Sequence, residues 1–160
     1  MAALTEAATR RLSECREEDA SVWKEIDAHE RVTESAPRVW ACSEFVATSC
    51  SRDPAMLRAL AENGRLFERA TQEWMAADLQ AHERGTSEAE LMEALRRFRR
   101  RHMVRIAWRD IAGWADLDET LRDLSALADV CIQFAYRHMY DALTARYGVL
   151  GGAGDGGDQL

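Results

Sequence analysis

The chain has 160 residues, of which 47% are hydrophobic, and it carries a formal net charge of −7 at pH 7. This length and hydrophobic content are enough for one domain that buries roughly 68–70% of its unfolded surface, which excludes a wholly disordered chain. The net negative charge argues against nucleic acid as a partner, because general nucleic-acid binding depends on a basic surface.

Only two prolines interrupt the chain, so the sequence favours long helices over many short strands. Residues 4–34 predict one or two helices. The next helix is predicted to begin near Pro37, because a proline at the first helical position loses no intrahelical hydrogen bond. Ser35 or Ala36 would be its N-cap, and its apolar face would continue to Cys50.

Two shorter helices follow, each with its own boundary signals. Asp53 is the predicted N-cap of the first, Pro54 occupies its first position, and Gly64 ends it. The second is predicted to begin at Leu66 and to stop at Gly85, with apolar residues in phase between them.

Capping boxes introduce the last two helices; in such a box the N-cap side chain and a glutamate three residues later each satisfy a backbone N–H of the other. Ser87 with Glu90 predicts one start, and Asp116 with Glu119 predicts the other. The last helix is predicted to run to about Tyr147, roughly 45 Å at 1.5 Å per residue. Its apolar stripe consists of Leu117, Leu121, Leu124, Ala128, Cys131, Ile132, Ala135, Met139 and Leu143.

The segment after this helix holds six of the nine glycines and predicts a flexible linker or a frayed end. We therefore predict an all-α fold, a bundle of five to seven helices with a long C-terminal helix and a flexible glycine-rich tail. The helical bundle domain is expected over residues 1–148 and the tail over residues 149–160.

An arginine-rich helix follows the first capping box, with seven arginines and no acidic residue between positions 96 and 109. On a helical wheel its apolar stripe is centred on Leu91, Leu95 and Phe98. Five arginines avoid this stripe, and we interpret them as a solvated face. They are Arg96, Arg97, Arg99, Arg100 and Arg101.

His102, Arg105 and Arg109 lie on the stripe instead. Since the opposite side of this stretch is also apolar, the helix is predicted to be buried there. A buried guanidinium requires an anion or carbonyl partner. Two interpretations are open, an ion pair inside the bundle or a contact with an anion or a neighbouring domain. Arg105, Arg109 and the nearby Asp110 are the candidate residues for such an interdomain or anion contact.

No other pattern predicts chemistry. The four cysteines and four histidines lack metal-ligand spacing, and no phosphate-binding or nucleophile motif occurs, so we predict no metal, cofactor or catalytic residue in this chain. The N-terminus lacks the apolar stretch of a signal peptide, and no apolar run approaches 18 residues. We therefore expect a cytoplasmic protein with reduced thiols and no membrane partner.

Two stretches carry a family resemblance within about residues 37–147, PRVWACSEFVATSCSRDPAMLRAL and LRRFRRRHMVRIAWRDIAGWADLDETLRDLSALADVCI. Their most distinctive part is R-x-x-x-R-D at Arg105, Arg109 and Asp110, followed by L-S-x-L-A-D at Leu124–Asp129. They resemble the N-terminal helical region of the bacterial glutamine-synthetase adenylyltransferases, which are bifunctional adenylylating and adenylyl-removing enzymes.

The resemblance implies a large cytoplasmic enzyme with two nucleotidyltransferase domains. One half would remove AMP from glutamine synthetase by phosphorolysis, and the other would add AMP from ATP. Both would use magnesium held by a D-x-D motif, and PII-type signal proteins and glutamine would regulate the balance. The family's G-x-G-K-L-G-G segment and catalytic D-x-D would follow the last residue of this chain, so it resembles an N-terminal piece and receives no catalytic residue.

We therefore expect the chain to support and dock the downstream nucleotidyltransferase domain that regulates glutamine synthetase, and to be inactive alone. Magnesium and ATP or phosphate would belong to the longer enzyme. The alternative is a helical module that binds a protein or RNA through the basic face of residues 96–101.

Overall fold

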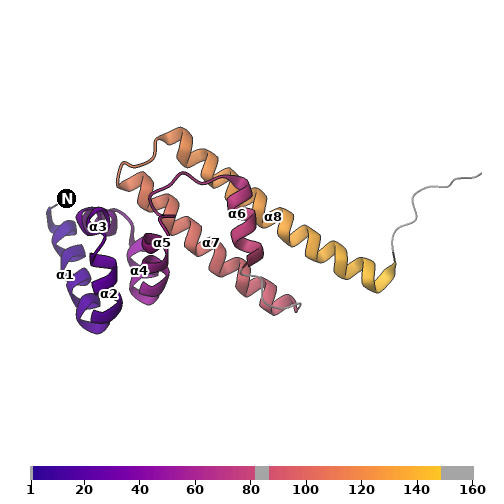
Figure 1. The fold of residues 1–160 in the computed structure, drawn as a ribbon, viewed down its shortest axis with the longest axis horizontal. Coiled ribbons are helices and arrows are strands. Elements are labelled where there is room, and N and C mark those ends of the chain that lie inside the picture. The colour runs from indigo at the N-terminus through magenta and orange to yellow at the C-terminus, as the bar shows by residue number, and fades with distance from the viewer. Residues whose placement is uncertain (1, 82–86, 149–160) are drawn as a thin grey trace, which may run out of the picture.

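The computed structural model describes residues 2–81 and 87–148. Within these ranges the regular structure is entirely helical, which confirms the all-α prediction, and eight helices are present where five to seven were expected. Figure 1 shows them in chain order as α1 (Ala2–Glu18), α2 (Ala20–Asp27), α3 (Glu30–Cys42), α4 (Glu44–Arg52), α5 (Pro54–Glu62), α6 (Gln72–Ala81), α7 (Glu88–Ile111) and α8 (Leu117–Tyr147).

The first five helices gather at one end of the molecule (Figure 1). α1 packs against α3, and α2 packs against α5. Trp23 of α2 and Trp40 of α3 meet edge to face, with ring centroids 5.9 Å apart. The buried apolar core around them also receives Val104 and Trp108 from α7, so this end of the molecule holds α7 in place.

The last three helices form the other end. α7 and α8 run antiparallel, and α6 contacts both of them (Figure 1). The turn between α7 and α8 contains Gly113, whose φ of 75° lies in the left-handed region that glycine adopts without strain. A second apolar cluster joins the three helices and consists of Met75, Leu79, Phe98, Ile106, Leu127 and Val130.

The predicted helix start at Pro37 is wrong, because Pro37 lies inside α3, which begins at Glu30. The apolar residues of α3 keep their helical spacing through the proline and are buried, so tertiary packing overrides the local preference. The predicted continuation to Cys50 is also wrong. Ser43 leaves the helical conformation and caps α4 by accepting a hydrogen bond from the Val46 backbone N–H at 3.3 Å, so one expected helix becomes two.

The helix predicted from Leu66 begins only at Gln72. Gly64 ends α5 with a φ of 74°, as predicted, and the chain then crosses residues 65–71 without forming a helix. Leu66 is nevertheless fully buried in this connection. The predicted stop at Gly85 lies outside the described residues.

Three of the four predicted N-caps form; the exception is the predicted cap at Ser35 or Ala36, because both residues lie inside α3. Asp53 accepts a hydrogen bond from the Met56 backbone N–H at 3.1 Å, and Ser87 with Glu90 makes both halves of a capping box. Asp116 caps α8 through the Glu119 backbone N–H at 2.7 Å. The reciprocal half of that box is wrong, because the Glu119 carboxylate binds arginines on other segments.

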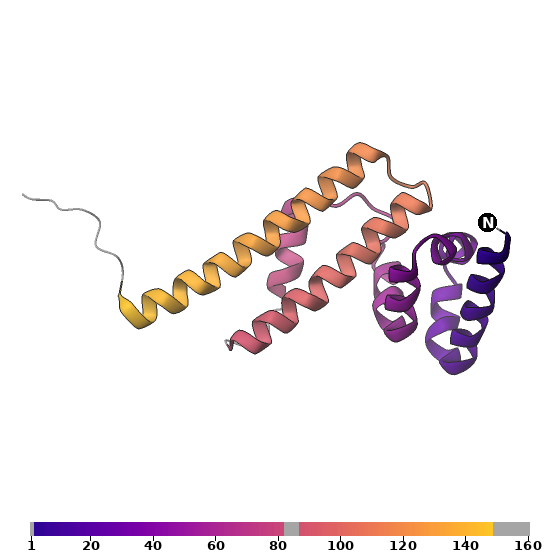
Figure 2. The same ribbon diagram turned by 180° about the vertical axis from the view of Figure 1, so that it is seen from behind.

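α8 extends to Tyr147, as predicted, and Figure 2 shows its last turns running on past α6 and α7. No helix among residues 2–81 and 87–148 has the length and apolar character needed to cross a membrane. The predicted glycine-rich tail, residues 149–160, lies outside the described residues, and the domain division at residue 148 stays a prediction.

Candidate functional site

Arg105 of α7 is fully buried, and its guanidinium group donates hydrogen bonds to two different segments of the chain. One terminal nitrogen donates to the Asp123 carboxylate of α8 at 2.7 Å. Its Nε donates to the Arg65 backbone carbonyl at 2.9 Å, and the other terminal nitrogen donates to the Glu68 carbonyl. Two carbonyls of the connection 65–71 therefore accept hydrogen bonds from an arginine side chain instead of from helical N–H groups, which is consistent with its non-helical conformation.

Arg109 lies one turn further along α7 and repeats this pattern. It donates to one oxygen of the Glu119 carboxylate at 2.6 Å and to the Leu66 carbonyl at 3.2 Å. The other Glu119 oxygen accepts from Nε of Arg69 at 2.9 Å, so this carboxylate joins two cations. We call Arg105, Arg109, Glu119 and Asp123 the arginine–carboxylate cluster.

The electrostatics of this cluster follow from its burial. Burial lowers the pKa of Arg105, and hydrogen bonding to Asp123 opposes that change. Burial would raise the pKa of Glu119, but hydrogen bonds from Arg109 and Arg69 outweigh it and hold that pKa below its ordinary value. The carboxylate is therefore ionised at neutral pH and stabilises the buried guanidinium group of Arg109 and the exposed one of Arg69.

The described contacts of Arg105 and Arg109 match the internal ion-pair interpretation. Asp110 is exposed and stands outside the cluster, where its carboxylate accepts a hydrogen bond from the Thr120 hydroxyl at 3.2 Å. A contact of these three residues with another domain stays a prediction. The partners Glu119 and Asp123 were not predicted, although their four-residue spacing on α8 matches that of Arg105 and Arg109 on α7.

The solvated-face interpretation holds for four of the five arginines. Arg96, Arg97, Arg99 and Arg100 are exposed. Arg101 is the exception, because it is half-buried and donates to the Asp78 carboxylate of α6. Docking of α6 against this side of α7 explains the difference.

His102 shares the Asp78 carboxylate with Arg101. The His102 ring is 1% exposed, and its Nε2 lies 3.0 Å from an Asp78 oxygen, whereas its Nδ1 has no partner among the described residues. Burial lowers the pKa of His102, the nearby Arg101 and Arg105 lower it further, and Asp78 opposes this effect. The neutral imidazole is therefore the form that the folded chain favours.

We predict that the free energy of unfolding decreases as the pH falls below about 6.5. The unfolded state takes up a proton on His102 near its ordinary pKa, while the folded state resists that proton, so acid favours unfolding. Urea denaturation at pH 8, 6 and 5 measures the effect. In the His102→Gln variant this part of the pH dependence should disappear, and an unchanged slope in the variant would contradict the prediction.

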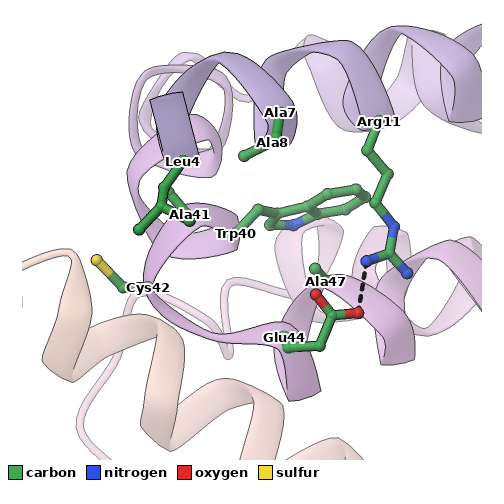
Figure 3. Close-up of a pocket in the computed structure, with 9 residues that line it drawn as sticks. All are labelled: Leu4, Ala7, Ala8, Arg11, Trp40, Ala41, Cys42, Glu44 and Ala47. Atoms are coloured by element: carbon green, nitrogen blue, oxygen red, sulfur yellow. Dashed lines mark hydrogen bonds and ion pairs between the residues drawn. The ribbon is translucent and has the colours of Figure 1, made fainter. Parts of the chain in front are cut away.

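A cavity of about 430 Å³ lies between α1, α3 and α4 and is the site drawn in Figure 3. Arg11 donates to Glu44 at 2.8 Å on one side of it. Trp40 forms a wall of the cavity, and its indole N–H has no partner among the described residues. Figure 3 shows mostly short apolar side chains around this ring, so the cavity lacks the paired acid and base of a catalytic centre.

Metal ligands are also absent from the described part of the chain, where no group of three or more His, Cys, Asp or Glu side chains could hold an ion.

The predicted apolar stripe of α8 is the other prominent feature. Most of its large members do not enter the core, because the inward face of α8 carries Glu119, Asp123, Leu127 and Val130 instead. Large exposed apolar residues on α8 are Leu117, Leu121, Leu124, Ile132, Tyr136, Met139, Tyr140, Leu143 and Tyr147, which we call the α8 stripe.

Taken over residues 2–81 and 87–148, the fold and these sites define a helical module with an internally paired arginine–carboxylate cluster and an open apolar helix face. The family model described as glutamate-ammonia ligase adenylyltransferase matches residues 33–159. The chain therefore belongs to the glutamate-ammonia ligase adenylyltransferase family, which confirms the resemblance inferred from its sequence.

Individual relatives agree with this assignment. The chain is 45% identical over 119 residues to a bifunctional glutamine synthetase adenylyltransferase/adenylyl-removing enzyme of Nitrosococcus oceani, covering 71% of this chain and 12% of the relative. It is 42% identical over 132 residues to the enzyme of the same name from Pseudomonas aeruginosa, covering 81% of this chain and 13% of the relative. The chain thus spans about an eighth of these relatives' length. No solved structure matches it significantly.

Proposed function

We propose that the chain is a docking and supporting module of a glutamine synthetase adenylyltransferase, in which the α8 stripe contacts a nucleotidyltransferase domain of the same enzyme. The observation that carries this proposal is the exposure of the stripe. Leu117 is 69% exposed, Ile132 is 66% exposed and Tyr147 is 70% exposed. Complete burial of each such side chain is worth about 1.5–3 kcal/mol, and large contiguous apolar surfaces on proteins mark interaction sites.

The relatives supply a reason to place the partner within the same enzyme. This chain matches only 12–13% of their length, so most of each relative consists of other segments that can cover the stripe. The active sites would lie in those segments and would use magnesium with ATP or phosphate. Glutamine synthetase is the target named for the relatives, and we extend it to this chain together with a PII-type regulator and a cytoplasmic location.

The arginine–carboxylate cluster supports this role by fixing the direction of α8. Arg105 and Arg109 of α7 bind Asp123 and Glu119 near the start of α8, and this sets how the stripe is presented. The exposed Asp110 sits beside the same turn and offers a carboxylate to the docked domain. Arg105 and Arg109 would therefore affect docking through the position of α8.

A chimeric enzyme tests the proposal. The segment of the Pseudomonas aeruginosa enzyme that matches this chain is replaced by this chain's sequence, and AMP removal from adenylylated glutamine synthetase is followed with phosphate and magnesium. Substituting Leu121, Leu124 and Ile132 together by glutamine should slow the reaction at least tenfold, which corresponds to about 1.4 kcal/mol of lost docking free energy. The matched control replaces the same three residues by methionine, which keeps the surface apolar.

Two further measurements make the outcome specific. The melting temperature of the isolated 160-residue chain should not fall with the glutamine substitutions, because these side chains are exposed. The isolated chain should release no ADP from adenylylated glutamine synthetase. Full activity of the glutamine chimera, or ADP release by the isolated chain, would overturn the proposal.

A further inference from the structure

A groove of about 340 Å³ lies between α4 and α7, apart from the α8 stripe and the arginine–carboxylate cluster. Phe45 of α4 lines one side and Met103 of α7 lies on the other. Arg96, Arg99 and Arg100 of α7 complete the lining. The groove thus combines an apolar wall with three guanidinium groups on one helix face.

The three arginines have charge available for a partner. Arg99 and Arg100 make no ion pair with a carboxylate in residues 2–81 and 87–148, and the side chain of Arg96 donates only to the Met92 carbonyl there. Arg97, on another side of the helix, is by contrast paired with Glu93 at 2.9 Å. Like charges at this spacing repel one another on a helix, so their concentration is unfavourable until an anion binds.

The apolar part of the groove is also incompletely covered. Phe45 is 46% exposed, and Met92, one turn before Arg96 on α7, is 47% exposed. Methionine and phenylalanine side chains suit a protein surface that receives another apolar side chain, since methionine adapts its shape and phenylalanine offers a large contact area. The groove therefore has two recognition elements, one for carboxylates and one for an aliphatic or aromatic side chain.

We propose that this groove binds an acidic amphipathic helix of a partner protein. Carboxylates of the partner pair with Arg96, Arg99 and Arg100, because a planar guanidinium group can donate two parallel hydrogen bonds to one carboxylate. Apolar residues one turn away on the same partner helix contact Phe45 and Met103. The groove thus recognises the partner helix by the spacing of its charged and apolar residues.

The charge distribution favours a protein partner over a nucleic acid. The whole chain carries −7, so an extended polyanion that passes beyond the groove meets a negatively charged protein. A nucleic-acid backbone also gains nothing from Phe45 and Met103 unless its bases leave the stack. A short acidic helix satisfies the arginines and the apolar wall together.

Fluorescence anisotropy with the 160-residue chain tests this inference. The probe is a labelled 20-residue peptide with Glu or Asp on one side of a helix and Leu or Phe at helical spacing beside it. We expect saturable binding that weakens at least tenfold in the double variant R99E/R100E. The control R97E/R137E makes the same change in net charge on exposed residues outside the groove, and it should bind nearly as well as the unmodified chain.

Three kinds of outcome would overturn the inference. The first is an equal loss of binding in R97E/R137E, which indicates general attraction to a positive charge. The second is unchanged binding in Phe45→Gln, or equally tight binding of a peptide of the same composition without helical spacing. The third is tighter binding of a 20-nucleotide uridine RNA that R99E/R100E abolishes and Phe45→Gln leaves intact, which assigns the groove to nucleic acid. Circular dichroism of each variant checks that the helices are retained.

Discussion

Replacement of Arg105 by methionine is expected to lower the free energy of unfolding by about 3–5 kcal/mol, the usual loss when one member of a buried ion pair is removed. The variant leaves the Asp123 carboxylate buried without its cation. It also removes the hydrogen bonds that Arg105 donates to the Arg65 and Glu68 carbonyls. Because a chain of this size loses about 2–4 °C of melting temperature per kcal/mol, the melting temperature should fall by roughly 10 °C.

The pair can be tested as a pair. The double variant Arg105→Met with Asp123→Leu should be more stable than Arg105→Met alone, because it removes the uncompensated charge. Arg99→Met is the matched surface control on the same helix and should change stability by no more than about 0.5 kcal/mol. Equal melting temperatures for the Arg105 and Arg99 variants would contradict a structural role for the cluster.

Replacement of Trp108 by alanine should destabilise the chain by a similar amount, about 3–5 kcal/mol. Trp108 is fully buried where α7 meets the N-terminal helices, and its indole N–H donates to the Ser35 hydroxyl of α3 at 2.9 Å. The alanine variant leaves a cavity in this core and removes that hydrogen bond. Urea denaturation followed by circular dichroism measures the change.

A second variant separates packing from hydrogen bonding at this position. Trp108→Phe retains most of the apolar volume but cannot donate to Ser35, so its loss should be markedly smaller, about 1–2 kcal/mol. Similar losses in the alanine and phenylalanine variants would show that the hydrogen bond, and not the packing, stabilises the contact between α3 and α7.

The features that the sequence predicted well are local. The caps at Asp53 and Ser87 need only residues within one turn, and the structure contains both. The burial of Arg105 and Arg109 followed from the helical wheel, since both lie on the apolar stripe of α7. Their identification did not require knowledge of the tertiary structure.

The features that the sequence missed depend on contacts between distant segments. Residues 65–71 have the periodicity of a helix, but three of their carbonyls are bound by arginines about 40 positions away. The apolar stripe of α8 pointed to the wrong face, because the described chain buries Asp123 and Glu119 against α7 and leaves that stripe open. A periodicity argument assigns the apolar face to the core and cannot detect a helix that buries carboxylates and leaves its apolar face exposed.

The length of α8 gives it the geometry of a lever. Its last buried residue is Val130, and about 25 Å of helix follow before Tyr147. A pivot of about 10° at that point displaces the far end by about 4 Å, while the helix itself stays straight. A small change in the packing of α6 and α7 would thereby move the exposed apolar residues at the far end of α8 by a distance comparable to a side-chain contact.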